Sequence, residues 1–174
     1  MPSSRLVLCT LALPWLIGCA SAPPAAPAGA SPVTVAFIAP DKFTDICSSR
    51  PPLQTARDAY LAELRKFIVQ DAARPLPPGQ RLDIEVTNGD IAGDFEPWRM
   101  RSADVRVVRD IYPPRMTLNV RITGADGQVL AEGERKLSDM SYLQNSTPVD
   151  TDNLRFEKRM IDDWLRRELP APQA

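Results

Sequence analysis

A strictly alternating segment in the second half of the chain constrains the fold more than any other feature. From Met116 to Thr123, apolar and polar residues take turns without a break. A period of two places the apolar side chains on one face of a strand, so this segment predicts a strand that is buried on one side. The turn residues Ala125-Asp126-Gly127 connect it to a second extended run, Gln128 to Leu137. The two runs together predict a β-hairpin.

Three more strands are expected ahead of the hairpin. The first is the β-branched and aromatic run from Val33 to Ile38. The second runs from Leu82 to Thr87, where apolar and polar residues alternate again, and Asn88-Gly89-Asp90 is expected to end it. Val105 and Val107 indicate a third, shorter strand, and a pair of prolines follows it.

Two other segments have the 3.6-residue period of an amphipathic helix. The first runs from Leu53 to Ala73, with Ser49 as the expected cap and two prolines in the first turn. The second begins near Asp152 or Asn153 and ends at Pro170. The apolar residues that repeat at helical spacing are Tyr60, Leu61, Leu64, Phe67, Ile68 and Ala72 in the first helix, and Phe156, Met160, Ile161, Trp164 and Leu165 in the second.

The order of elements is therefore β-α-β-β-β-β-α. Amphipathic helices and strands with one buried face must cover each other, and the stable solution is a two-layer α+β sandwich. We expect a mainly antiparallel sheet of four to five strands with both helices on one face. Residues 33–170 form this single domain, and residues 171–174 are a tail.

The first eighteen residues are typical of a bacterial lipoprotein signal peptide. Arg5 provides the positive charge, and an apolar stretch follows that is too short to span a bilayer, which takes about 20 residues. Leu16-Ile17-Gly18-Cys19 resembles a lipobox, which predicts lipidation of Cys19. The alternative is an ordinary secretory signal that is cleaved after Ala20 or Ala22.

A tether is expected between the anchor and the domain. Residues 19–32 comprise the lipidated cysteine and a run of alanine, proline, serine and glycine, a composition that cannot bury a core. Because Ala20 rather than aspartate follows Cys19, we expect an outer-membrane lipoprotein that faces the periplasm. Two or three acyl chains would make the attachment stable. The alternative signal would give a soluble periplasmic protein.

Composition excludes several kinds of chemistry. The chain has no histidine, which removes histidine-based nucleophile activation and most zinc and haem sites. A formal net charge of −1 gives no reason to expect nucleic-acid binding. Cys47 is the only cysteine of the predicted domain, so no disulfide can form within it, and we expect this thiol to be buried beside the first strand. No catalytic residue, cofactor or metal site is predicted.

The segment from Asp90 to Ser102 lacks a clean period and is expected to be a long loop that Phe95 and Trp98 anchor to the core. It is the candidate interaction loop if Trp98 is exposed, although Trp98 could instead be a lid over the core. Its candidate residues are Asp90, Asp94, Phe95, Glu96, Trp98 and Arg99.

Two other kinds of site in this loop remain open. Asp90, Asp94 and Glu96 could serve a carboxylate-dependent glycan hydrolase, which needs two carboxyl groups at a defined separation. The same oxygen-rich loop could bind Ca²⁺, although its spacing departs from the EF-hand pattern.

Four arginines around the predicted strands could bind an anionic lipid or glycan. They are Arg106, Arg109, Arg115 and Arg121. Arg106 and Arg121 are expected at outward strand positions, where neighbouring acidic residues would neutralise them.

Several motifs resemble a bacterial family known as domain of unknown function 3016. They are Gly93-Asp94-Phe95-Glu96-Pro97-Trp98, Asp104-Val105-Arg106-Val107, Ile111-Tyr112-Pro113-Pro114-Arg115, Leu130-Ala131-Glu132-Gly133-Glu134, Leu154-Arg155-Phe156-Glu157-Lys158-Arg159 and Asp162-Asp163-Trp164. The resemblance spans Val33 to Leu169. It implies an exported envelope protein and supplies no activity and no catalytic residue.

These observations predict a non-catalytic envelope lipoprotein, with an accessory domain that is tethered to the membrane. A protein or peptidoglycan is the expected partner, and the candidate interaction loop or the edge of the hairpin is the expected contact surface.

Overall fold

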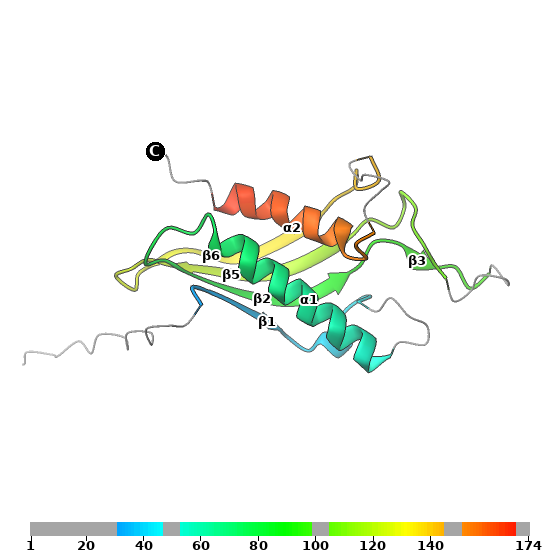
Figure 1. Cartoon of the computed structure of the whole chain (residues 1–174), viewed down its shortest axis with the longest axis horizontal. Coiled ribbons are helices and arrows are strands. Elements are labelled where there is room, and N and C mark those ends of the chain that lie inside the picture. The colour runs from blue at the N-terminus through cyan, green and yellow to red at the C-terminus, as the bar shows by residue number, and fades with distance from the viewer. Residues whose placement is uncertain (1–30, 47–52, 99–104, 145–150, 170–174) are drawn as a thin grey trace, which may run out of the picture.

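The computed structural model describes residues 31–46, 53–98, 105–144 and 151–169 of the chain (Figure 1). The regular elements, in chain order, are β1 (Val33–Phe37), the short 3₁₀ helix η1 (Pro40–Lys42), α1 (Gln54–Ala73), β2 (Arg81–Asp90), β3 (Asp94–Phe95), β4 (Arg106–Val107), β5 (Arg115–Thr123), β6 (Val129–Ser138) and α2 (Arg155–Glu168).

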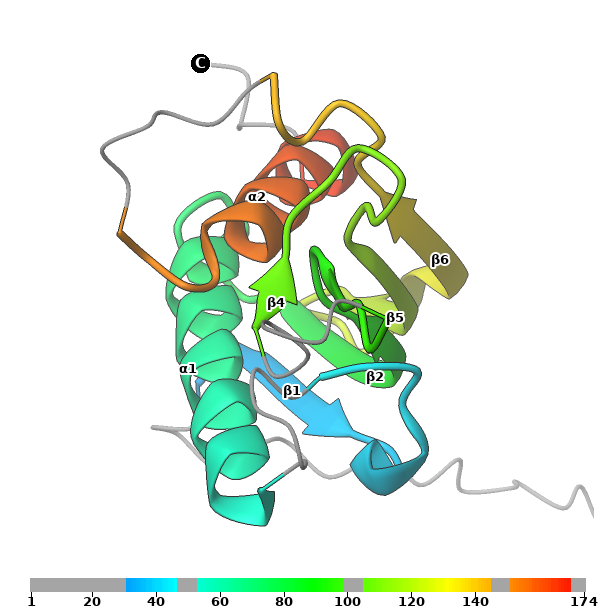
Figure 2. The ribbon, with the colours of Figure 1, turned by 90° about the vertical axis from the view of Figure 1, so that its right-hand side faces the viewer.

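Four strands make the main sheet, in the order β1-β2-β5-β6. β1 and β2 are parallel and α1 connects them, while β2, β5 and β6 pair antiparallel. Both helices cover the same face of this sheet (Figures 1 and 2). The two-layer α+β fold predicted from the sequence is confirmed.

The core lies between the sheet and the helices. The alternating segment predicted from Met116 onward is β5, and its apolar side chains are all buried. They pack with Leu82, Ile84 and Val86 of β2, each at most 1 % exposed. The helices contribute Leu64 and Ile68 of α1, together with Met160, Ile161, Trp164 and Leu165 of α2. Each such aliphatic side chain contributes about 1.5–3 kcal/mol when it is fully buried.

The prediction that Asn88-Gly89-Asp90 ends the second strand is wrong. β2 continues to Asp90, with an irregularity in its pairing to β5 between Val86 and Asn88. Gly89 lies close to the Ile46 side chain, since a Cβ atom on it would come within 2.8 Å of the terminal methyl group of Ile46. Its carbonyl accepts a hydrogen bond from the Asp45 amide. Asn88-Gly89-Asp90 therefore follows an irregularity in the strand and lies close to the backbone of Asp45, rather than forming a turn.

The third predicted strand exists but does not join the main sheet. β4 pairs antiparallel with β3, which the sequence did not predict, and the two form a separate two-stranded ribbon. The predicted long loop therefore contains a strand of its own.

Both predicted helices are confirmed, and each begins a little later than expected. In the first helix, Phe67 is only partly buried, whereas the other five predicted core residues are buried. The predicted cap Ser49, the lipobox Leu16-Ile17-Gly18-Cys19 and Cys47 lie outside the described residues. Within the described ranges, no helix combines the length and apolarity needed to span a bilayer.

Candidate functional site

Three segments come together at the end of the main sheet where β2 finishes and β5 starts, and we call them the terminal lobe. They are residues 91–98, residues 105–114 and residues 139–144, and this end faces the viewer in Figure 2. The Gly93 amide donates to the Tyr112 carbonyl at 3.0 Å, and the Asp139 amide to the Pro114 carbonyl at 3.4 Å. The Tyr142 hydroxyl donates to the Arg109 carbonyl. The lobe is therefore one connected structure.

Gly93 determines the path of the chain into the lobe. Its φ angle of +83° lies in the left-handed region, and a Cβ atom would lie 2.8 Å from the Val107 carbonyl oxygen. Both conditions favour glycine. The following residue begins β3, so Gly93 brings β3 against β4.

The inside of the lobe contains charged groups. Glu96 is 1 % exposed. Its carboxylate lies 3.2 Å from the Arg109 guanidinium and accepts a hydrogen bond from the Tyr112 hydroxyl at 3.4 Å. A buried carboxylate is tolerated only when such partners compensate for its lost hydration.

Arg106 links the lobe to the segment after β1. Its Nη2 lies 2.6 Å from Oδ2 of Asp45, and its Nη1 donates to the Gly93 carbonyl at 2.6 Å. The guanidinium also stacks 4.8 Å from the centre of the Phe95 ring. Since its side chain is only 13 % exposed, the predicted outward position of Arg106 is wrong.

Glu157 of α2 joins the lobe from the helix layer. It is 2 % exposed, and its Oε1 accepts a hydrogen bond from the Ala92 amide at 2.7 Å. Burial raises the pKa of the Glu157 carboxyl group. Burial, followed by the neighbouring Glu157 carboxylate, also raises the pKa of Tyr60 on α1. Glu96, Arg106 and Glu157 are referred to below as the buried charges of the lobe.

Large apolar side chains are exposed on the outside of the lobe. Of the ten large hydrophobic side chains that are exposed in the described residues, six belong to the lobe. Trp98, Ile111 and Met140 are the most exposed of these, at 68 %, 62 % and 66 %. The six are Trp98, Val105, Val108, Ile111, Met140 and Leu143.

The candidate interaction loop is thus part of a larger structure. Phe95 anchors it, as predicted, because its side chain is buried. Trp98 is neither an anchor nor a lid, because its side chain is 68 % exposed, as the interaction-loop hypothesis requires. Arg99 lies outside the described residues.

The three carboxylates proposed for hydrolysis have different surroundings. Asp94 is exposed and accepts a hydrogen bond from the Phe95 amide, whereas Glu96 is buried against Arg109. Asp90 lies 3.9 Å from Arg115, and burial, followed by the Asp45 carboxylate, raises the pKa of Asp90. Among the described residues, no group of three or more cysteine or acidic side chains is placed to hold a metal ion.

The remaining arginines also face acidic residues. Arg109 pairs with Glu96, Arg115 with Asp90, and Arg121 with Glu132. Neutralisation by neighbouring acids is therefore confirmed.

The positions of Glu157, Asp45 and Tyr60 beside the lobe were not predicted from the sequence. One signal was present: Glu157 precedes Ile161 by four residues and Trp164 by seven, which places a carboxylate on the apolar face of its helix. Asp45 had no such signal, because only the fold brings it to Arg106.

Comparison with known families gives a match to the model described as "Protein of unknown function (DUF3016)" over residues 31–167. The matched range includes the whole terminal lobe and the main sheet. No curated protein matches the chain.

Proposed function

The chain belongs to the DUF3016 family, and on this premise we propose that it is a non-catalytic envelope lipoprotein whose terminal lobe binds a protein partner. The observation that carries the proposal is the number of large apolar side chains that the lobe exposes, since six of the ten in the described residues belong to it. Behind them, the carboxylates of Glu96 and Glu157 are buried beside apolar side chains. Exposed apolar surface and buried carboxylates both reduce the stability of an isolated domain.

Such an arrangement is favourable when the surface becomes covered. Exposed aromatic and aliphatic side chains that cluster at one site are typical of contact surfaces, and tryptophan is prominent among the residues that dominate binding energy. The charged pairs behind them hold the two-stranded ribbon in place, because they fix Gly93 and Ala92 by hydrogen bonds. A surface held in one conformation loses less entropy on binding.

The direction of the sheet supports a partner that lies away from the anchoring membrane. Val33 of β1 pairs with Leu82 near the start of β2, whereas the lobe follows the other end of β2. Ten residues of strand separate these two ends by about 30 Å. The start of β1, which would follow a tether up to residue 32, and the lobe therefore lie at opposite ends of the sheet (Figure 1).

Paired substitutions test the binding surface. Val129 and Leu130 are 50 % and 56 % exposed and lie at the remote end of the sheet, so they are matched controls. We expect Trp98→Ala with Ile111→Ala to lose partners that crosslink to the full chain in intact cells, and Val129→Ala with Leu130→Ala to retain them. Identical partners for both double variants would refute a binding role for the lobe.

A second experiment tests the anchor separately. Cys19→Ala is expected to release the folded protein into the soluble periplasmic fraction, whereas Cys9→Ala should leave it with the membranes. If Cys19→Ala still fractionates with membranes, the lipoprotein assignment is incorrect.

A further inference from the structure

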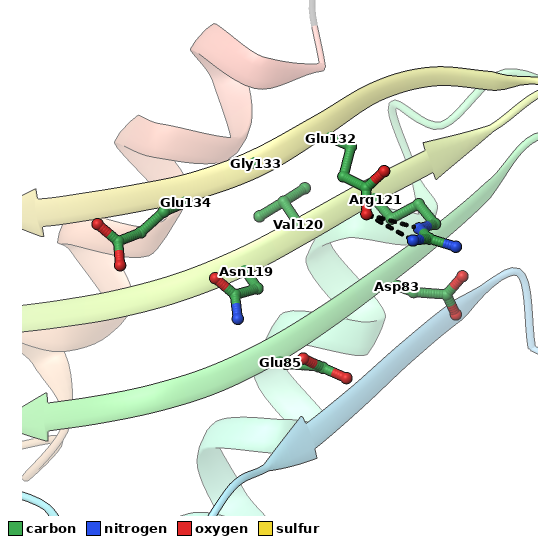
Figure 3. Close-up of a pocket in the computed structure, with 8 residues that line it drawn as sticks. All are labelled: Asp83, Glu85, Asn119, Val120, Arg121, Glu132, Gly133 and Glu134. Atoms are coloured by element: carbon green, nitrogen blue, oxygen red, sulfur yellow. Dashed lines mark hydrogen bonds and ion pairs between the residues drawn. The ribbon is translucent and has the colours of Figure 1, made fainter.

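The face of the main sheet opposite the helices is polar and forms a shallow hollow. Six outward side chains of β2, β5 and β6 surround a space of about 440 Å³. Strand register places them in two rows across the sheet. One row is Asp83, Arg121 and Glu132, and the other is Glu85, Asn119 and Glu134 (Figure 3). No described segment forms a layer over this face.

Negative charge is in excess in the hollow. The four carboxylates surround one guanidinium, whereas the whole chain carries a formal net charge of only −1. The Glu132 carboxylate accepts hydrogen bonds from Nε of Arg121 at 3.1 Å and from Nη2 of Arg121 at 2.5 Å. The Glu134 carboxylate pairs with Lys136 at 3.2 Å. Asp83 and Glu85 form no ion pair with another described residue. The charges of Asp83 and Glu85 act on Arg121 from a distance. They add to the larger effect of Glu132, which raises the pKa of Arg121.

The spacing of the carboxylates adds a geometric constraint. Asp83 and Glu85 are two residues apart on one strand, as are Glu132 and Glu134 on another. Alternate residues of a strand point to the same face about 7 Å apart. An extended polypeptide repeats its own alternate side chains at the same interval, so basic residues at every second position would match Asp83 and Glu85, whereas Glu132 and Glu134 already pair with Arg121 and Lys136.

We propose that this open face binds an extended polypeptide segment that carries lysine or arginine at alternate positions. Complementarity of charge and the common strand repeat select this occupant. A small cation or a polyamine could neutralise the charge but would not require the repeat. The face lies outside the terminal lobe, so the proposal does not depend on the proposed function of the lobe.

Titration of the full-length mature chain with two short peptides tests this inference. The first peptide alternates lysine with threonine, and the second has the same number of lysines, each separated from the next by two threonines. We expect the alternating peptide to bind about threefold more tightly, because Asp83 and Glu85 can then be paired at once, and both affinities should fall with added salt. Equal affinity for the two peptides, or no binding of either, would overturn the proposal.

Matched charge variants locate the site. Asp83→Asn with Glu85→Gln removes two carboxylates from the hollow with little change in shape, and about tenfold weaker binding of the alternating peptide is expected. Asp41→Asn with Asp58→Asn removes two exposed carboxylates elsewhere and should leave the affinity unchanged. The proposal is incorrect if both double variants weaken binding equally, or if spermidine or Ca²⁺ alone binds the hollow as tightly as the alternating peptide.

Discussion

The terminal lobe and the helix–sheet body of this protein differ in what they bury and what they expose. In the body, the interior is apolar and the charged residues of the sheet face solvent. In the lobe, Glu96 is buried at 1 % exposure and Glu157 of α2, at 2 %, is buried against the lobe, while Trp98 and Ile111 are exposed. Apolar burial stabilises a fold without a geometric requirement, whereas a buried charge is stable only with its partners in place.

This contrast indicates a division of tasks within one domain. Apolar burial in the body stabilises the fold. The buried carboxylates of the lobe reduce this stability, and their hydrogen bonds hold an apolar surface in a fixed shape. Substitutions in the two regions should therefore differ in how far their effects spread through the molecule.

The largest loss of stability is expected from the body. Leu118 on β5 is 1 % exposed and packs at the centre of the main core. Leu118→Ala should lower the free energy of unfolding by about 4 kcal/mol, because the lost transfer energy adds to the cost of a cavity. Urea denaturation followed by circular dichroism measures the change. A loss confined to the lobe would contradict the idea that the body is the cooperative unit.

A smaller and more local loss is expected from the buried guanidinium. Arg106→Met keeps the stem of the side chain but removes the guanidinium that pairs with Asp45 and donates to the Gly93 carbonyl. We expect a cost of about 3 kcal/mol. Hydrogen exchange should show reduced protection in residues 91–98, while the amides of β5 stay close to wild type. Uniform deprotection of both regions would show that the lobe and body are not energetically distinct.

The same contrast explains what the sequence could predict. The alternation in β5 and the helical period of α2 determine which side chains are buried, so the two-layer fold follows from the chain alone. In the lobe, buried apolar side chains such as Phe95 and Tyr142 lie together with ionisable groups. Only Glu157 has a periodic signal, because it lies on the apolar face of its helix. The pairing of Arg106 with Asp45 spans more than sixty residues of sequence and depends on the assembled sheet.

The pH dependence of stability should have opposite signs for two carboxylates of α2, Glu157 where the helix contacts the lobe and Glu168 where it contacts the sheet. Burial raises the pKa of Glu157 above its ordinary value of 4.5, so the folded state favours the protonated acid. Its contribution to stability is complete below pH 4.5 and is lost as the pH rises through the folded pKa. Glu157→Gln keeps an acceptor for the Ala92 amide and removes the charge, and at pH 7 it should stabilise the protein by about 1 kcal/mol.

Glu168 provides the comparison in the body. Hydrogen bonds from Arg135 hold the pKa of Glu168 below its ordinary value of 4.5. This stabilisation is present above pH 4.5 and is lost as the pH falls through the folded pKa. Denaturation of both variants across the pH range should therefore show Glu168→Gln destabilised at neutral pH and Glu157→Gln stabilised. If the free energy of unfolding depends on pH in the same way for both variants, the partners of Glu157 stabilise its charged form as well as Arg135 stabilises that of Glu168.

The smallest effect is expected from an ion pair of similar chemistry on the open face of the sheet. Arg121 and Glu132 contact each other as closely as Arg106 and Asp45 do, but the side chains of both are 53 % exposed. Solvent and salt screen an exposed pair, and holding two long side chains together costs entropy. Arg121→Gln should therefore leave the urea midpoint unchanged within error, both in low salt and in high salt. A shift as large as that of Arg106→Met would show that burial does not distinguish the two pairs, and the contrast between lobe and body would then require another explanation.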